Sequence, residues 1–168
     1  MRLTLLLLIA LSCFAAACGS SGARERSSTP ETPAPPPGAR TIALQYDSGT
    51  LHVEVAQTPD ERGRGLGFRD ALAEDSGMLF DLGRTRVPGF WMKGMKFALD
   101  MVWIDEGMRI VGVTEDVQPE PGVADAQLRR YSPDQPVRYV LELNAGAARR
   151  LGIEAGERVT FELPQVTR

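Results

Sequence analysis

The sequence contains few of the residues on which metal and redox sites usually depend. Its 168 residues include one histidine, His52, and two cysteines, Cys13 and Cys18. Zinc sites usually take several histidine or cysteine ligands, so a zinc site built on several histidines is excluded. Because both cysteines fall within the first eighteen residues, the rest of the chain holds no disulfide framework, zinc knuckle or catalytic cysteine.

Basic residues are not in excess either, since 19 lysines and arginines stand against 22 aspartates and glutamates, for a net charge of −3. This balance does not indicate a nucleic-acid surface, and we expect no nucleic-acid partner. The sequence has no Gly-rich phosphate loop, nucleophile elbow or metalloprotease motif, and we expect no cofactor. A content of 24% charged and 43% hydrophobic residues fits a soluble globular chain of one domain.

The N-terminus is typical of an export signal. An apolar run from Leu3 to Ala17 follows Arg2, and its fifteen residues span roughly 22 Å as a helix, less than the roughly 30 Å of a bilayer core. The small residues before Cys18 resemble a bacterial lipoprotein signal, in which the cysteine is lipidated and becomes the new N-terminus. We therefore predict a signal peptide over 1–17 and a lipid anchor in the cell membrane or outer membrane. The alternative is an ordinary signal peptide that leaves Cys18 as a free thiol.

Residues 18–40 are rich in Ser, Pro and Gly and show no apolar periodicity. Such a segment cannot bury enough apolar surface to offset the entropy of ordering it. We predict that it is a disordered tether and that residues 41–168 form the single folded domain.

The folded part shows the period-two alternation of strands. Turn residues at Asp47–Gly49 separate two alternating runs and predict a hairpin over 41–56. His52 falls on the polar side of this hairpin and is interpreted as a surface residue. Further strands are predicted around residues 78–82, 100–105, 110–114, 137–143 and 159–163.

Two short helices interrupt the strands. A capping box at Thr58, with Pro59 at the first helical position, begins the first helix. Asn144 is predicted to cap a second helix that runs to Leu151 and ends at Gly152. The pattern predicts a mainly β fold, an antiparallel sandwich or a partly closed barrel with two short helices.

Several phrases of the sequence together resemble the family known as domain of unknown function 192. These phrases are Thr58-Pro59-Asp60-Glu61-Arg62, Gly65-Leu66-Gly67-Phe68-Arg69, Gly77-Met78-Leu79-Phe80, Phe90-Trp91-Met92-Lys93, Leu99-Asp100, and Val140-Leu141-Glu142-Leu143 with Ala145-Gly146. The resemblance covers nearly all of residues 50–163 and implies a compact, mainly β domain of bacteria and archaea, often exported, without an established activity. The chain departs from the family pattern at Gly67, where Met is usual, and at Gly94-Met95, where Asn-Thr is usual. If the Asn-Thr polar groups belong to a site, that site is altered here.

The candidate ligand-binding residues are those matched residues that combine an aromatic face with charge: Trp91, Lys93, Asp100, Arg69 and Glu142. Trp91 and Lys93 share one face of an extended segment, which would form a pocket with an aromatic wall. In the alternative interpretation, Trp91 packs in the core and Lys93 pairs with a carboxylate.

Three functions remain open. The first is an envelope-tethered module that binds a small molecule, a glycan or an envelope protein, without turnover. The second is a small envelope hydrolase that uses Asp100, Glu142 and Lys93 as acid and base groups. The third is Cu(I) handling by the thioethers of Met92, Met95 and Met101, although methionine also fills irregular cores.

The lipid anchor can be tested at Cys18. The Cys18→Ser variant should either leave the detergent phase or accumulate as an unprocessed precursor, because it lacks the thiol that accepts the lipid. Phase partitioning and intact mass measure this. Equal mature mass and equal partitioning of variant and wild type would contradict the lipoprotein prediction.

Overall fold

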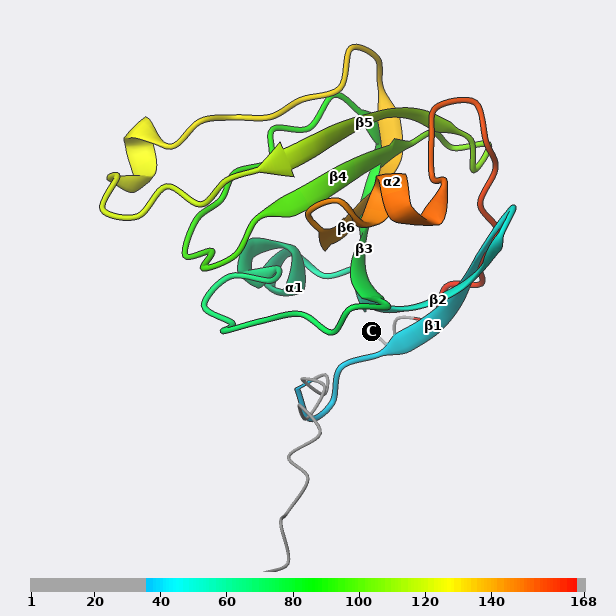
Figure 1. Cartoon of the computed structure of the whole chain (residues 1–168), viewed down its shortest axis with the longest axis horizontal. Helices are drawn as coiled ribbons and strands as arrows, with labels where there is room; N and C mark the ends of the chain where they lie inside the picture. The colour runs from blue at the N-terminus through cyan, green and yellow to red at the C-terminus, as the bar shows by residue number, and fades with distance from the viewer. Residues whose placement is uncertain (1–35, 166–168) are drawn as a thin grey trace, which may run out of the picture. The chain divides into compact units, whose positions relative to one another are not determined.

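A computed structural model describes residues 36–165 (Figure 1). The predicted signal peptide, Cys18 and most of the predicted tether lie outside these residues. Within them, no helix has both the length and the apolar character needed to cross a membrane.

Six strands and two short α-helices make up the domain. The strands are β1 (Thr41–Tyr46), β2 (Gly49–Ala56), β3 (Ser76–Arg86), β4 (Leu99–Ile104), β5 (Ile110–Val117) and β6 (Val137–Asn144). The helices are α1 (Pro59–Arg64) and α2 (Ala147–Leu151), and a 3-10 turn, η1, spans Asp125–Gln127. The predicted mainly β fold with two short helices is confirmed.

The six strands form one sheet in the order β1-β2-β3-β6-β4-β5. Four of its strand pairs are antiparallel, whereas β2 and β3 are parallel, so the sheet is mixed. A parallel pair requires a long connection, and residues 57–75, which contain α1, supply it. The cyan β1–β2 hairpin lies at one edge of the sheet and β4–β5 at the other (Figure 1). The sheet is not closed into a barrel.

The central strands are buried on both faces of the sheet. All six residues of β4 are buried, as are the residues from Gly77 to Leu82 of β3. One apolar core lies on the face covered by α2 and the C-terminal segment, and a second lies on the opposite face. A strand covered on both faces reads as a continuous apolar run, so the alternation seen in the sequence is clear only near the edges.

The strand register decides which side chains share a face. Glu142 of β6 lies between Met78 of β3 and Met101 of β4, and Met78 in turn pairs with Glu54 of β2. These four residues therefore form a row across one face of the sheet. Asp100 precedes Met101 on β4, so its side chain points to the opposite face.

The segment after α2 differs from its predicted strand. Thr160 bridges Gln45 of β1, and Arg158 bridges Arg109 just before β5, but no continuous ladder forms. Val159 and Phe161 nevertheless enter the core, as their alternation implies. The segment thus contacts both ends of the strand order without becoming a strand of the sheet.

The predicted helix caps have different outcomes. The capping box is present, because Thr58 and Glu61 each accept a hydrogen bond from the other's backbone. Asn144 does not cap α2, whose N-cap is Gly146 in the left-handed region. The Asn144 amide instead donates to the carbonyl oxygens of Leu72 and Ala73, both at 3.1 Å. A side chain that ties a distant loop to β6 cannot also cap the neighbouring helix.

Asp100 fixes α2 to the sheet. Its carboxylate is fully buried and accepts hydrogen bonds from the backbone N–H groups of Asp116, at 2.9 Å, and Ala148, at 3.0 Å. Hydrogen bonds to a charged acceptor are stronger than neutral ones. Asp100 is therefore a structural residue that joins β4, β5 and α2.

The Asp100→Ala variant should lose about 3 kcal/mol of unfolding free energy, because two N–H groups lose their charged acceptor. Urea denaturation measures the loss. The control, Asp134→Ala, removes an exposed carboxylate and should change stability by less than about 0.5 kcal/mol. Equal stabilities for the two variants would show that Asp100 does not hold α2.

Candidate functional site

Four acidic side chains are buried within residues 36–165: Glu54, Asp81, Asp100 and Glu142. A buried carboxylate is costly unless partners satisfy it, so the partners of each are informative. Glu54 forms a two-point ion pair with Arg69, with N–O distances of 2.5 and 2.9 Å. Asp81 accepts from Arg138 at 3.0 Å and from the Gly83 N–H at 2.8 Å. Asp100 has the two backbone donors described above.

Glu142 differs from the other three acids. The residue is only 5% exposed, and none of the side-chain hydrogen bonds among the described residues involves its carboxyl oxygens, which are open to the adjoining cavity. Burial raises the pKa of Glu142 to about 8, although the nearby Arg69 charge acts in the opposite direction. At neutral pH the group is therefore mostly protonated, and it can donate a hydrogen bond as well as accept one.

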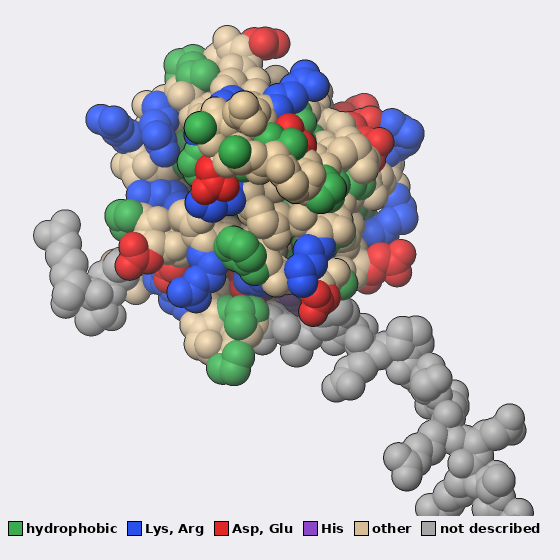
Figure 2. All heavy atoms as spheres, turned by 90° about the vertical axis from the view of Figure 1, so that its left-hand side faces the viewer, with side chains coloured by type: hydrophobic (Ala, Val, Ile, Leu, Met, Phe, Trp, Pro, Cys, Tyr) green, Lys and Arg blue, Asp and Glu red, His purple; other side chains and the backbone are tan. Residues whose placement is uncertain are grey.

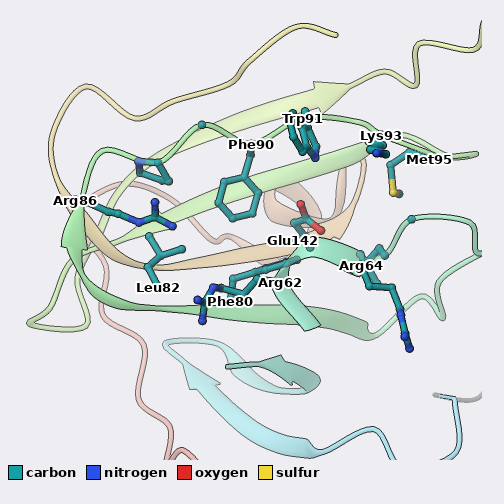
Figure 3. Close-up of a pocket in the computed structure, with 16 residues that line it drawn as sticks. Arg62, Arg64, Phe80, Leu82, Arg86, Phe90, Trp91, Lys93, Met95 and Glu142 are labelled. Atoms are coloured by element: carbon teal, nitrogen blue, oxygen red, sulfur yellow. The ribbon is translucent and has the colours of Figure 1, made fainter. Parts of the chain in front are cut away.

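The Glu142 carboxyl opens into a cavity of about 210 Å³ (Figure 3). Two segments form the walls of the cavity. One is residues 62–67, at the C-terminal end of α1 and just beyond it, and the other is residues 86–95, from the last residue of β3 onward. Phe80 and Leu82 of β3 also line the cavity. Its apolar lining includes Leu66, Phe80, Leu82, Phe90, Trp91 and Met95, and its charged lining consists of Arg62, Arg64, Arg86, Lys93 and Glu142. We call this space the Glu142 cavity.

The aromatic wall is held by specific packing. Phe90 meets Phe80 and Trp103 edge to face, with ring centroids 5.1 and 5.8 Å apart. Trp91 is half-buried and carries the Arg130 guanidinium over its ring, 3.3 Å from the centroid. Such contacts fix the rings in place, so the wall exists before a ligand arrives.

Two glycines let the walls approach each other. A Cβ on Gly67 would lie 2.9 Å from the Lys93 carbonyl oxygen, and a Cβ on Gly94 would lie 2.7 Å from the Phe68 ring. Gly94 also has a φ of +67°, which favours glycine. Gly67 and Gly94 are the positions where the sequence departs from the family pattern, so the two departures meet at the junction of residues 65–68 with residues 93–94.

The basic groups around the cavity have different partners. Arg62 donates to the carbonyl oxygens of Gln57 and, at 3.0 Å, Asp81. The Lys93 ammonium lies 2.5 Å from the Asp125 carboxylate of η1, in a pair whose side chains are 41% and 63% exposed. Among the described residues, no carboxylate lies within ion-pair distance of Arg64 or Arg86.

The face that carries the η1 loop is chemically mixed. Figure 2 shows basic side chains on this face with hydrophobic side chains scattered between them. The large apolar side chains that the described part of the chain exposes are Phe68, Val87 and Val123. Apolar groups that charges separate are less suited to a broad protein interface than to a local binding pocket.

The structure brings together three of the five predicted binding residues. Trp91, Lys93 and Glu142 all line the Glu142 cavity. Arg69 lies beside it, paired with Glu54 and close enough to lower the pKa of Glu142. Asp100 lies on the other face of the sheet, so the predicted placement of Asp100 in the pocket is wrong, and so is its pairing with Glu142 as acid and base.

The three methionines of the copper hypothesis belong to the same hydrophobic core. Met92 and Met101 are buried in it on the Glu142 face, and Met95, which also lines the cavity, packs against it. No group of three or more His, Cys, Asp or Glu side chains that would hold a metal ion occurs in residues 36–165. His52 is exposed, in agreement with its interpretation as a surface residue.

Arg86, Phe80 and Phe90 line the cavity but are not among the five candidate residues, although Phe90 belongs to the segment Phe90–Lys93 that the sequence points to. The only available signal for Arg86 was its position at the end of an alternating strand, followed by Val87-Pro88-Gly89. Phe80 and Phe90 were recognised as part of matched phrases, but only the fold shows that they face one cavity.

The fold and site define a small β-sheet domain with a cavity lined by aromatic and charged side chains and, among its described residues, no group of His, Cys, Asp or Glu side chains that would hold a metal ion. The profile of DUF192, described as an uncharacterized ACR, matches residues 42–161, and the chain belongs to this family. No curated protein matches the chain.

Two solved structures resemble the domain. One is a Sinorhizobium meliloti protein provisionally described as a transcription regulator. It is 36% identical, with a TM-score of 0.65, over 73% of this chain and 95% of that chain. The other is a protein of unknown function from Novosphingobium aromaticivorans. It is 25% identical, with a TM-score of 0.64, over 79% of this chain and 94% of that chain.

The raised pKa of Glu142 predicts a pH-dependent stability. The folded state keeps its proton up to a pH of about 8, whereas the unfolded chain loses it near 4.5. The contribution of protonated Glu142 to the free energy of unfolding is therefore fully present below pH 4.5 and is lost as the pH rises through 8. Unfolding free energy should fall between pH 5 and pH 8, by at most about 1.4 kcal/mol per pH unit.

Glu142→Gln should flatten this dependence because glutamine stays neutral throughout. Urea denaturation at a series of pH values measures the effect, with the exposed Glu74→Gln as the matched control. An equal pH dependence in wild type and Glu142→Gln would show that Glu142 ionises normally in the folded state.

Proposed function

We propose that this protein is an envelope-tethered module that binds a small molecule in the Glu142 cavity and does not turn it over. The observation that carries the proposal is the buried Glu142 carboxyl, which has no partner among the described residues and opens into a cavity with an aromatic wall. Buried polar groups are usually hydrogen-bonded. Among the described residues no side-chain polar atom is both sealed from solvent and without a hydrogen-bond partner, so the Glu142 oxygens are open to the cavity, where a ligand can hydrogen-bond to them.

The lining supports a small, partly apolar ligand. Phe90 and Trp91 offer ring surfaces, and Glu142 offers one hydrogen-bonding group on a rigid strand. Small-molecule sites combine apolar walls with fixed polar groups, and the lining here offers both kinds of surface, with the polar part somewhat larger. Both sugar-like rings and small organic acids fit this chemistry.

Binding is favoured over hydrolysis by the arrangement of the acids. A glycosidase acts with two carboxyl groups roughly 5 to 9.5 Å apart, on either side of the bond that it breaks. Among the carboxyl groups in the described residues, Glu142 alone lines this cavity, and Asp100 points to the other face of the sheet. Lys93 is held by Asp125 and so is less available as a base.

The proposed place of action follows from the N-terminus. An apolar run, small residues and Cys18 support export and a lipid anchor, and the Pro-rich residues 19–40 support a tether between membrane and domain. A domain held in this way would meet small molecules or glycan fragments of the cell envelope.

The function can be tested with a defined panel of probes. We expect ligand-observed NMR to detect binding from a panel of neutral monosaccharides and small ring-bearing carboxylic acids. Glu142→Met should abolish this binding without lowering the melting temperature, because it replaces an unpartnered buried carboxyl with an apolar group of similar size. Lys93→Ala should weaken binding and cost less than about 1 kcal/mol, since its ion pair is exposed.

The matched control is Glu74→Gln, which changes an exposed acid outside the cavity. Binding that persists unchanged in Glu142→Met would contradict the proposal, as would a panel in which no compound binds in a Glu142-dependent manner. A large loss of stability in Lys93→Ala, with binding retained, would assign Lys93 to the scaffold.

A further inference from the structure

We infer that the ligand of the Glu142 cavity is a small amphipathic carboxylic acid. Its carboxylate would bind Arg86, its apolar middle would lie against Phe90, and an oxygen at its far end would hydrogen-bond with Glu142. The inference rests on the proposed function and names the ligand class for the same site.

Arg86 is the cationic group of the cavity that is best placed to receive an anion. It is an exposed residue at the end of β3, its side chain lines the cavity, and no described carboxylate lies within ion-pair distance. Lys93, in contrast, is paired with the Asp125 carboxylate. Arg62 has no carboxylate partner among the described residues either, but its guanidinium already donates to the backbone carbonyl oxygens of Gln57 and Asp81. A guanidinium matches a carboxylate with two parallel hydrogen bonds, which gives both affinity and orientation.

Arg64 also has no carboxylate partner among the described residues, but its orientation differs. Figure 3 shows that the Arg64 head group extends away from Glu142. The Arg86 side chain lies on the other side of Phe90 from Glu142, so the Phe90 ring stands between the two polar groups (Figure 3). A ligand that touches both must pass along this ring.

The space between the two polar groups determines the body of the ligand. Leu82 and Phe90 line the cavity, lie between Arg86 and Glu142 in Figure 3, and offer no hydrogen bonds from their side chains. A flat apolar ring satisfies such walls, whereas a chain of hydroxyl or phosphate groups does not. A cavity of about 210 Å³ takes a molecule of roughly ten non-hydrogen atoms.

The charges of the site favour a monoanion. At neutral pH a protonated Glu142 does not repel a ligand carboxylate, and its hydroxyl can donate to an oxygen at the ligand's far end. The Arg86 guanidinium balances one negative charge, whereas the Arg62 guanidinium is engaged by two backbone carbonyl oxygens and the Arg64 head group extends away from Glu142. A carboxylate therefore fits better than a phosphate monoester, which carries nearly two charges at neutral pH.

Calorimetric titration of the full-length protein with 4-hydroxybenzoate tests this class, because that probe has a carboxylate, a flat ring and a distal hydroxyl. We expect it to bind at least tenfold more tightly than benzoate, which lacks the hydroxyl, and than 4-hydroxybenzyl alcohol, which lacks the charge. Phenyl phosphate should also bind more weakly. Arg86→Gln should remove the preference for the acid over the alcohol.

The matched control is Arg84→Gln, because Arg84 is exposed on the same strand, two residues away, and is not part of the cavity lining. It should keep the affinity of the wild type. Neither variant should change the melting temperature, so a loss of binding in Arg86→Gln is not a loss of folding.

The outcomes separate this inference from the proposed function. Equal binding of acid and alcohol, or an acid preference that survives Arg86→Gln, would overturn the inference but leave Glu142-dependent binding intact. Tighter binding of phenyl phosphate than of 4-hydroxybenzoate would overturn the carboxylate assignment. Absence of Glu142-dependent binding for every neutral and acidic probe would overturn the proposed function as well.

Discussion

Glu142 stands on a central strand between Met78 and Met101, in a sheet that is covered on both of its faces. A carboxyl group in such a place loses its hydration, and the protein usually compensates with a cation or with backbone donors. Glu54 and Asp100 are compensated in these two ways, by Arg69 and by the N–H groups of β5 and α2. Glu142 instead keeps its proton at neutral pH and faces a cavity. Its neutral carboxyl group is therefore exposed to whatever enters the cavity, and the candidate site depends on this arrangement.

The cavity is built by contacts between segments that are distant in sequence. Phe90 and Tyr131 exchange two backbone hydrogen bonds of 2.8 and 2.9 Å, Arg130 stacks on Trp91, and Lys93 pairs with Asp125. These contacts attach the loop between β5 and β6 to the aromatic segment. Gly67 and Gly94 allow the opposite wall to approach closely. A wall fixed in this way loses little conformational entropy when a ligand binds, which favours affinity in a small site.

Much of the fold is encoded locally, and the sequence therefore predicts it well. The hairpin, the capping box of α1 and the central strands follow from turn residues and period-two alternation. The site depends on register, which local patterns do not contain. Asp100 and Glu142 lie on different strands, and a shift of one residue in their pairing would place them on the same face. The sequence does not predict the burial of Glu54 either. Its alternation with Val53 and Val55 suggests that Glu54 faces solvent, whereas in the fold it is buried.

The most direct test of this account is an NMR titration of the Glu142 side-chain carboxyl carbon in the folded protein. The titration midpoint should lie near pH 8, because burial raises the pKa of this group to about 8. The midpoint should also change measurably when a ligand hydrogen-bonds to the carboxyl group. A midpoint near 4.5, the ordinary value for glutamate, would show that Glu142 is hydrated and charged in the folded state. That result would contradict the central claim that a buried, protonated Glu142 is the recognition group of the cavity.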